Sequence, residues 1–374
     1  MISFWEKTAL LEYDLIVIGG GITGLFCALS YREKYPNASI AILERGLFSS
    51  GASTKNAGFA CFGSLSELAA DLHTMSEDEL VQLVDLRLQG LQKLRSTLGD
   101  KIIEFESFGG YELFFDEHSE PLNEIDKINK LLSPLFSKPV FSSNPAKINA
   151  FGFNSNKVKH LVENPFEGQI HTGKMMRALR SKANEKDITF FSNIQVLGWN
   201  QDQIIEIRTS IHNREMELKC TKLAVCTNGF TKDFYKQLNL LPGRGMVLVT
   251  KPIKNLQIKG AFHYNSGYNY FRNINDRVLL GGGRNLDFNS ETTTAFGINP
   301  DIKEKLISDL STFILPNQAF EIEMEWSGIM AFGTNKKPLI KKMDNHIALG
   351  VRLGGMGIAI GSKVGEATAK LLFD

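Results

Sequence analysis

Residues 13–32 read YDLIVIGGGITGLFCALSYR, and this stretch decides the fold. Residues 13–18 are mostly apolar and β-rich, whereas apolar residues recur at helical spacing from Ile22 onward. The three glycines Gly19, Gly21 and Gly24 therefore stand between a strand and a helix. In such a turn the first glycine permits the bend, the second lets backbone N–H groups approach a diphosphate, and the third lets the helix pack on the strand. Ile22 and Thr23 open the helix, whose positive end would hold the diphosphate.

A second apolar strand, residues 39–43, ends in Glu44, twenty residues after Gly24. A carboxylate at this position can accept hydrogen bonds from both hydroxyls of a ribose. Strand, turn, helix, strand and acid together predict an ADP-ribose site. The alternative, a glycine turn followed by a surface acid, requires the coincidence of all five features.

The next segment, RGLFSSGASTKNAG at residues 45–58, is crowded with small and hydrogen-bonding residues. An NAD-binding domain has no chemical use for such a loop, so the segment favours FAD. The arrangement resembles the flavoprotein family of D-amino acid oxidase, glycine oxidase, sarcosine oxidase and γ-glutamylputrescine oxidase, in which this loop wraps the diphosphate and ribityl chain. The resemblance assigns such contacts to Arg45, Ala52, Ser53, Asn56, Ala57 and Gly58.

Three later segments match further cofactor contacts of that family. One is the end of the predicted strand near residues 194–196, one is the strand end at 222–229, and one is the glycine-rich helix start at 354–357. The implied contacts are Val196, Thr227, Asn228, Gly229, Gly354, Gly355, Met356 and Gly357. Asn228 departs from the family, where alanine or glycine is usual. A buried strand ending in a turn and a packing turn of small residues remain the alternatives.

The chain is expected to be an α/β protein with two domains. The predicted Rossmann-type FAD-binding domain comprises residues 1–75, 166–235 and 326–374. A discontinuous, largely antiparallel α+β substrate domain comprises residues 76–165 and 236–325. Residues 65–98 predict one or two amphipathic helices with a solvated charged face, and residues 105–115 predict a strand pair. The glycines at 281–283 are interpreted as a strand end near a ligand, because no apolar helix follows them.

Composition and charge limit the classes of molecule that this protein is expected to bind. The net charge is +1 and the basic residues are interspersed with acids, so no nucleic acid is expected. The four cysteines form no C-x-x-C pair and the histidines lack ligand spacing, so neither a disulfide framework nor a metal site is indicated, and a cytoplasmic location fits. The N-terminus lacks the pattern of a signal peptide, and no apolar run is long enough to span a membrane.

Substrate contacts are predicted from strand alternation. Tyr268, Tyr270 and Arg272 are spaced by two, so their side chains share one face. Facing the flavin they would form a cage for a carboxylate, and facing solvent they would be ordinary surface residues. The stretch from 270 to 283 looks most like γ-glutamylputrescine oxidase. The arginine that amino-acid oxidases of the family place after a tryptophan-glycine landmark is Met330 here.

That departure favours an amine or a larger N-substituted substrate, unless another arginine supplies the charge. The predicted catalytic residues are Tyr270, Arg272 and Arg352, with Arg272 preferred as the anchor for an anionic group. Arg244 is a further candidate. Met330 also occupies the region of a cysteine that attaches flavin in some relatives. FAD is therefore expected to be noncovalent, with Cys61 as the one possible exception.

The resemblance implies an FAD-dependent oxidoreductase that oxidises the C–N bond of an amine or amino acid by hydride transfer to flavin N5. Molecular oxygen or another acceptor would then reoxidise the flavin. Two alternatives remain. One is the related flavin domain that modifies the tRNA wobble uridine, and the other is a non-catalytic flavin-binding subunit of a complex.

Overall fold

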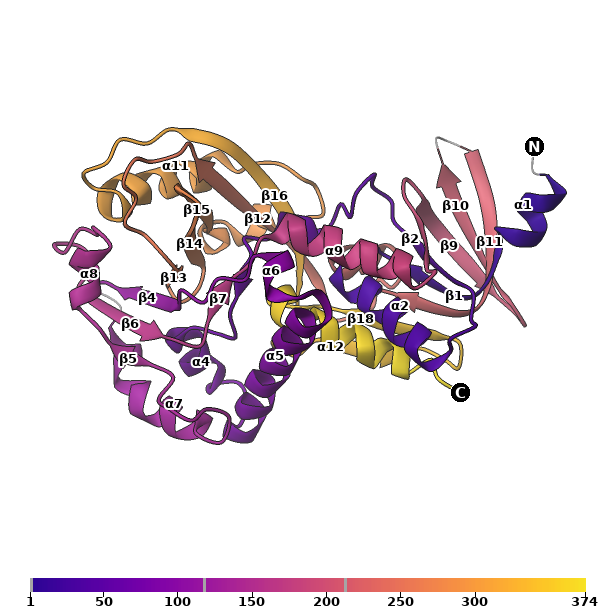
Figure 1. Ribbon diagram of the computed structural model, residues 1–374, viewed down its shortest axis with the longest axis horizontal. Coiled ribbons are helices and arrows are strands. Elements are labelled where there is room, and N and C mark those ends of the chain that lie inside the picture. Colours follow the sequence, from indigo (N-terminus) through magenta and orange to yellow (C-terminus); the bar gives the residue numbers. More distant parts are fainter. Residues whose placement is uncertain (1–2, 117–118, 212–213) are drawn as a thin grey trace.

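Two eight-stranded sheets divide the molecule, here called the first sheet and the second sheet (Figure 1). The computed structural model describes residues 3–116, 119–211 and 214–374. In the first sheet β1 lies between β2 and β11 and runs parallel to both, so the sequence motif forms the predicted βαβ unit. Its strand order is β17-β18-β11-β1-β2-β8, and β10 and β9 extend it from β11. The bounds are β1 (Glu12–Ile18), β2 (Ile40–Leu43), β8 (Thr189–Phe191), β9 (Gln195–Gln201), β10 (Ile205–Ile211), β11 (Arg214–Val225), β17 (Leu339–Lys342) and β18 (Ile347–Val351).

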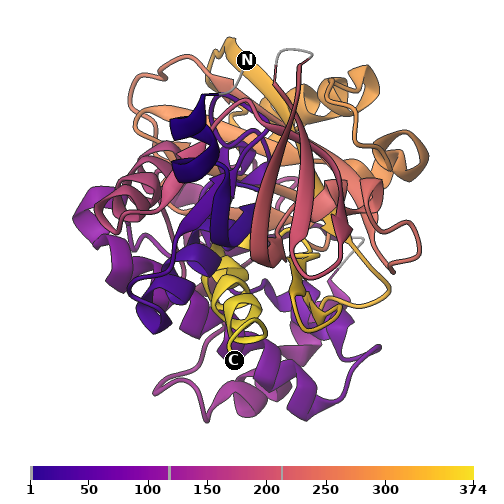
Figure 2. The same cartoon turned by 90° about the vertical axis from the view of Figure 1, so that its right-hand side faces the viewer.

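Helices cover one face of the first sheet, and the β9–β10 hairpin covers the other. The helices are α2 (Ile22–Lys34), α5 (Glu77–Leu98), α9 (Thr172–Glu185) and α12 (Gly357–Lys370). Leu15 and Val17 of β1 pack into the helical layer, whereas Ile16 and Ile18 pack toward the hairpin. A strand buried on both faces must be apolar throughout, which explains the continuous apolar run at this point. In Figure 2 the hairpin stands to the right of the indigo N-terminal segment, whereas the yellow helix α12 lies below and to the left of the hairpin.

The second sheet has the order β16-β12-β15-β14-β13-β4-β6-β5, and its neighbours are antiparallel except for the parallel pair β13–β4. The prediction of an α/β fold with a Rossmann-type part and a largely antiparallel second part is confirmed. The bounds are β4 (Gly110–Phe114), β5 (Ser142–Ser143), β6 (His160–Asn164), β12 (Leu241–Thr250), β13 (Ala261–Tyr264), β14 (Asn269–Ile274), β15 (Arg277–Gly282) and β16 (Ile322–Phe332).

The remaining helices are short, and a two-stranded ladder joins two segments that lie far apart in the chain. The ladder consists of β3 (Phe59–Ala60) and β7 (Gly168–Gln169). The remaining helices are α1 (Phe4–Ala9), α3 (Ala52–Lys55), α4 (Leu65–Asp71), α6 (Asp100–Ile103), α7 (Ile125–Leu132), α8 (Ala146–Ala150), α10 (Phe288–Glu291) and α11 (Pro300–Asp309). Within the described ranges no helix is long and apolar enough to cross a lipid bilayer.

Helix α5 belongs to both halves. Ser76 and Glu79 form a capping box at its start, which satisfies backbone N–H groups that have no partner inside the helix. Leu80 packs under the second sheet, whereas Leu94 packs in the core beside the first sheet. The proposed domain boundary at residue 76 thus begins a helix shared by both cores, and the boundary proposed at residue 326 falls inside β16.

The predicted strand pair at residues 105–115 is wrong. Only β4 forms there, and Glu106 makes a single bridge with Gln169 instead. Gly109 has a φ of +85°, a left-handed conformation that interrupts an extended strand. Gly109 therefore interrupts the extended chain directly before β4, and the segment does not form a hairpin.

Candidate cofactor and substrate site

One long cavity connects the two sheets. Its volume is about 720 Å³, within the range of sites that hold cofactors and small ligands. It begins at Ile18, Leu43 and Cys226, beside the carboxyl ends of β1, β2 and β11, and ends against α4 and the second sheet. Ligands of open parallel sheets bind in the same place.

The turn between β1 and α2 lines the start of the cavity. Gly19 has a φ of +105°, in the left-handed region that favours glycine. A Cβ on Gly24 would lie 1.9 Å from the carbonyl oxygen of Gly19. Gly24 therefore lets α2 lie directly on the turn, and it packs the helix without lining the cavity.

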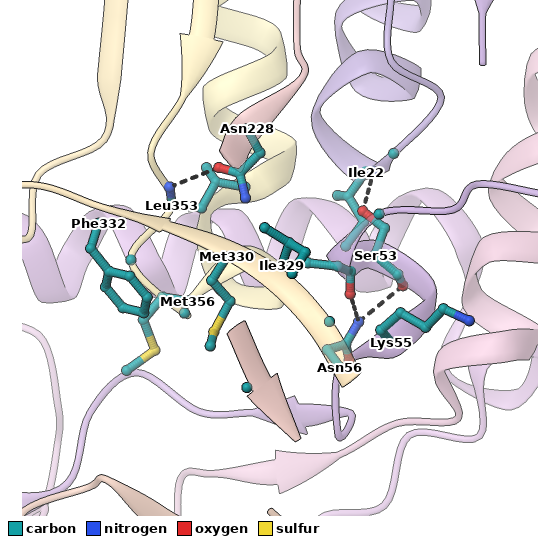
Figure 3. Close-up of a pocket in the computed structure, with 18 of the residues that line it drawn as sticks. Ile22, Ser53, Lys55, Asn56, Asn228, Ile329, Met330, Phe332, Leu353 and Met356 are labelled. Carbon is teal, nitrogen blue, oxygen red and sulfur yellow. Dashed lines mark hydrogen bonds between the residues drawn. The ribbon is translucent and has the colours of Figure 1, made fainter. Parts of the chain in front are cut away.

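Gly21 and the loop after β2 meet at the N-terminus of α2. The Oγ of Ser53 accepts a hydrogen bond from the backbone N–H of Ile22 at 3.0 Å, as Figure 3 shows. A Cβ on Gly21 would lie 2.7 Å from the same Oγ. Gly21, Ile22, Thr23 and Ser53 all line the cavity. The positive end of a buried helix thus faces a space where a diphosphate can bind.

Glu44 stands where the sequence predicts it, at the end of β2 and on the cavity wall. Its Oε2 accepts a hydrogen bond from the N–H of Gly20 at 3.1 Å, and its Oε1 accepts from the N–H of Gly46 at 2.9 Å and the Oγ of Ser50 at 2.8 Å. The carboxylate therefore joins the glycine turn to the next loop. Oε1 also accepts from the N–H of Ser50 at 3.2 Å, so its two lone pairs are occupied. Oε2 accepts one hydrogen bond and keeps one lone pair, which can accept from one ribose hydroxyl.

The loop that carries the predicted FAD contacts is held by its own side chains. Asn56 donates from Nδ2 to the carbonyl oxygen of Ser53 at 2.9 Å and accepts at Oδ1 from the N–H of Gly58 at 2.9 Å. Gly58 has a φ of +77°. The predicted loop residues Arg45, Ala52, Ser53, Asn56, Ala57 and Gly58 all lie on the cavity wall.

The opposite wall of the same region comes from β9 and the end of β11. Val196 and Thr227 line it, and the guanidinium of Arg45 lies 3.6 Å from the ring centroid of Phe230. Gly229 does not line the cavity. A Cβ there would lie 2.6 Å from the carbonyl oxygen of Met330, so Gly229 allows two chain segments to approach.

The structure explains why asparagine stands at position 228, where alanine or glycine is usual in the family. Its φ is +45°, and asparagine is among the residues that tolerate this conformation best. Its Oδ1 accepts a hydrogen bond from the N–H of Arg352 at 3.1 Å. It also accepts from the N–H of Leu353 at 3.4 Å, as Figure 3 shows. The amide thus joins the end of β11 to the turn before α12. The cavity wall at that turn is formed by Gly354, Gly355, Met356 and Gly357.

The far end of the cavity is a polar chamber, defined here by lining side chains of α4, of β13–β15 and the residues next to them, and of the end of β16 with the segment after it. Tyr270 and Met330 lie at its boundary with the cofactor part. The other chamber side chains used below are Glu67, Asp71, His263, Tyr268, Arg284, Phe332 and Lys336. Charged groups of both signs therefore face the same space as the predicted flavin-binding residues.

The preferred anion anchor, Arg272, does not line the cavity. Strand alternation is as predicted, because Tyr270 packs on the side of Ala57 and Phe59, whereas Phe271 packs in the core on the opposite side. The Arg272 side chain, however, is 4% exposed and lies behind Gly58, donating to its carbonyl oxygen at 3.4 Å. Burial lowers the pKa of this guanidinium to about 10. Sharing a strand face with Tyr270 did not bring Arg272 to the cavity, since the loop at Gly58 covers it.

Arg352 also does not line the cavity. Its guanidinium donates to the carbonyl oxygens of Asn239 at 3.0 Å and Lys337 at 3.0 Å, and to Oδ1 of Asn335 at 3.0 Å. These contacts hold the segment between β16 and β17. Arg244, the further candidate, forms a bidentate pair with Glu291, with distances of 2.9 and 2.7 Å.

Several residues of the chamber were not predicted from the sequence. The charges of residues 65–98 do not form only a solvated face, because Asp71 is 3% exposed and Arg87 is 2% exposed. Glu67 and Asp71 are four residues apart, which places both carboxylates on one face of a helix, and this spacing could have indicated a shared site. Arg284 directly follows the glycines that were interpreted as a strand end near a ligand. His263 carries no signal in the sequence.

Comparisons with known proteins agree with this geometry. The family described as FAD dependent oxidoreductase (DAO) matches residues 14–371. A search of curated proteins found no match. Among solved structures, L-proline dehydrogenase from P. horikoshii is similar at 17% identity with a TM-score of 0.76, covering 97% of this chain and 93% of that one.

Two further solved structures share the fold. Glycine oxidase from Geobacillus kaustophilus is 17% identical with a TM-score of 0.75, covering 97% of this chain and 95% of that one. L-amino acid deaminase from Proteus vulgaris is 18% identical with a TM-score of 0.72, covering 96% and 90%. Such identities show the fold alone, whereas the family match spans nearly the whole chain. The chain belongs to the DAO family of FAD-dependent oxidoreductases.

Proposed function

We propose that the protein oxidises the C–N bond of an amine or amino acid by hydride transfer to noncovalently bound FAD. The observation that carries the proposal is a continuous cavity, which runs from the glycine turn at α2 to the polar chamber. A dinucleotide and a small substrate can therefore occupy one connected space. Bound FAD supplies the hydride acceptor, and the protein's groups bind and orient the substrate.

The residues present fit FAD. The N-terminus of α2 lines the start of the cavity, and the start of α12 at Gly357 lines the same cavity. Both helix ends favour negative charge, the first for a diphosphate and the second for the flavin ring. Gly354 and Gly355 have φ values of +57° and +83°, so the backbone itself forms the wall there.

Noncovalent attachment is supported by the side chains near the chamber. Met330 lines the cavity (Figure 3), and a thioether cannot form the thiolate that would attack a flavin. Burial, reinforced by Glu167, raises the pKa of the Cys61 thiol, which keeps it protonated and poorly nucleophilic. We expect acid precipitation to release FAD into the supernatant. Yellow colour retained in the pellet would contradict this part of the proposal.

Arg284 is our candidate anchor for a substrate carboxylate. It lines the chamber, and its Cζ lies 4.0 Å from the ring centroid of Phe332 and 4.8 Å from that of Phe288. Within the described ranges its guanidinium makes no hydrogen bond or ion pair. Stacking fixes the plane of the guanidinium and leaves its N–H groups available at the edge. A carboxylate can accept two of them in parallel.

The chamber also offers a site of the opposite charge. Lys336 lies 2.8 Å from Oδ1 of Asp71, while Oδ2 of Asp71 has no partner among the described residues. Glu67 lies one turn earlier on the same helix face. Glu67 lines the chamber, so an ammonium group can approach its carboxylate, with the buried Asp71 beside it, while a carboxylate meets Arg284. The chamber therefore suits an amine that carries an acid group better than a plain hydrocarbon amine.

The decisive experiment is an anaerobic screen of amines and amino acids for bleaching of the flavin absorption band. At least one compound with an ammonium and a carboxylate group should reduce the flavin. Reoxidation by oxygen or by artificial acceptors then identifies the second substrate. Reduction by dithionite but by no amine or amino acid would refute the proposed reaction.

The anchor can be tested with a matched pair of variants. Arg284→Leu should lower kcat/KM for a carboxylate-bearing substrate by about 30-fold or more, because a truncated ion pair in a water-poor site costs roughly 2–5 kcal/mol. Its neutral analogue should be affected much less. Arg272→Leu should not discriminate between the two substrates, since that side chain lies behind Gly58. If Arg272→Leu impaired the carboxylate substrate selectively and Arg284→Leu did not, Arg272 would be the anchor, as predicted from sequence.

A further inference from the structure

A row of polar side chains crosses the second sheet and leads away from the chamber. Glu112 of β4, His263 of β13 and Tyr270 of β14 are direct neighbours across the strands. Side chains at paired positions point to the same face and lie about 5 Å apart at Cβ. Tyr270 and His263 line the chamber, whereas Glu112 is buried behind them.

A second, small cavity lies behind His263. His263 lines both cavities, and the small one is also lined by Glu112, Asn164 and Glu167. Its volume is about 10 Å³, near the smallest space that holds one water molecule. Asn164 is 3% exposed, and its Nδ2 has no hydrogen-bond partner among the described residues. A polar space with an unsatisfied donor suits an ordered water.

The two carboxyl groups behind His263 are held by short contacts from the chain. Oε2 of Glu112 accepts from the N–H of Ser66 at 3.0 Å, and Oε1 of Glu167 accepts from the N–H of Phe62 at 2.8 Å. Burial raises the pKa of each carboxyl to about 7. Both groups can therefore bind or release a proton near neutral pH.

His263 connects these carboxyl groups to the chamber. Its ring lies 5.1 Å from that of Phe59, and within the described chain neither ring nitrogen makes a hydrogen bond. Burial lowers its pKa, which favours the neutral imidazole that can accept a proton. The other titratable groups that face it are Glu67 of α4 and Tyr270 of β14. Burial raises the pKa of Tyr270 to about 12, so the phenol stays neutral.

We propose that His263 accepts the proton that a substrate ammonium must lose before oxidation, and that a water in the small cavity passes it to Glu112 or Glu167. This inference rests on the proposed amine oxidation. An N–H bond of the ammonium breaks and an N–H bond of the imidazole forms. The imidazolium then returns to neutral as a carboxylate becomes a carboxylic acid. No electrons are transferred in these steps, and the amine keeps the lone pair that assists hydride loss.

The connection can be tested first without a substrate, by infrared spectroscopy of the purified protein between pH 5 and 9. A carboxylic acid C=O band should disappear near pH 7, and Glu112→Gln or Glu167→Gln should each remove part of it. His263→Gln should shift its midpoint, because the ring shares the small cavity with both acids. The matched control is His160→Gln on β6, an exposed histidine. An unchanged midpoint in the His263 variant would overturn the relay.

The kinetic test uses an amine found by the anaerobic screen. With His263→Gln, flavin reduction at pH 7 should slow by about 100-fold or more, the usual contribution of a general base. The rate should recover as the pH approaches the pKa of the amine, where solution supplies the neutral form. A loss that is the same at every pH would assign His263 a structural role and refute the inference. Failure of the proposed function itself would look different, because the parent protein would show no reduction at any pH.

Discussion

The contact between Gly21 and Ser53 gives the sharpest prediction for the cofactor site. Gly21 has φ −81° and ψ −174°, values that alanine adopts without strain, so only space limits a substitution. The added Cβ would lie 2.7 Å from Ser53 Oγ but 3.6 Å from Ser53 Cβ. Carbon and oxygen atoms in ordinary contact lie roughly 3.5 Å apart. In Gly21→Ala the Oγ must therefore rotate away and release the N–H of Ile22.

The free-energy cost of Gly21→Ala has two parts, the crowding against Ser53 and the lost hydrogen bond from Ile22. Overpacking costs roughly 1–3 kcal/mol, and the lost hydrogen bond to Ile22 adds about 1 kcal/mol. Because 1.4 kcal/mol corresponds to a tenfold change in affinity, Gly21→Ala should raise the Kd for FAD by about 10-fold or more. Ser53→Ala should lose only the hydrogen bond. The double variant should bind FAD like Ser53→Ala alone, since the remaining Cβ is at an ordinary contact distance.

The assay is titration of the apoprotein with FAD, followed by quenching of flavin fluorescence, with thermal melting as the control for folding. A favourable coupling energy in this double-mutant cycle supports the contact with Ser53. If the double variant loses the sum of both single effects, the bound diphosphate and not Ser53 fills the space beside Gly21. Parent-like affinity in Gly21→Ala alone would refute the described cradle.

Three further predictions concern stability. Gly90→Ala in α5 should destabilise the protein by about 3 kcal/mol in urea unfolding, although alanine normally favours a helix. The reason is that the added Cβ would lie 1.9 Å from the carbonyl oxygen of Ala359. Gln92→Ala, at an exposed position of the same helix, is the control. Glu167 has a folded pKa of about 7, against an ordinary value of 4.5, so its contribution to stability is complete below pH 4.5 and is lost as pH rises through 7. Glu167→Gln should therefore gain about 3 kcal/mol relative to the parent between pH 4.5 and 8, and an advantage independent of pH would contradict this. Arg352→Ala should lower the unfolding free energy by about 3 kcal/mol, because its guanidinium donates to three oxygens, and a parent-like urea midpoint would show that those contacts contribute little.

The nucleotide-binding half was largely predictable from sequence because its signals are local. A strand buried on both faces must be apolar, and the crossing of α2 over the turn excludes a side chain at Gly24, so both features appear directly in the residue types. The position of Glu44 follows from the same unit. Each of these constraints acts within about thirty consecutive residues. The local pattern also predicted the glycine-rich start of α12.

The chamber depended on contacts between segments far apart in the chain. Tyr270 and Arg272 share a strand face, yet only Tyr270 reaches the cavity, because the loop at Gly58, more than two hundred residues earlier, covers the arginine. Arg284 and Asp71 come together only when the end of β15 and α4 meet across the chamber. Periodicity gives the direction of a side chain relative to its own element. Which segment then stands in front of it is decided by the packing of the whole chain.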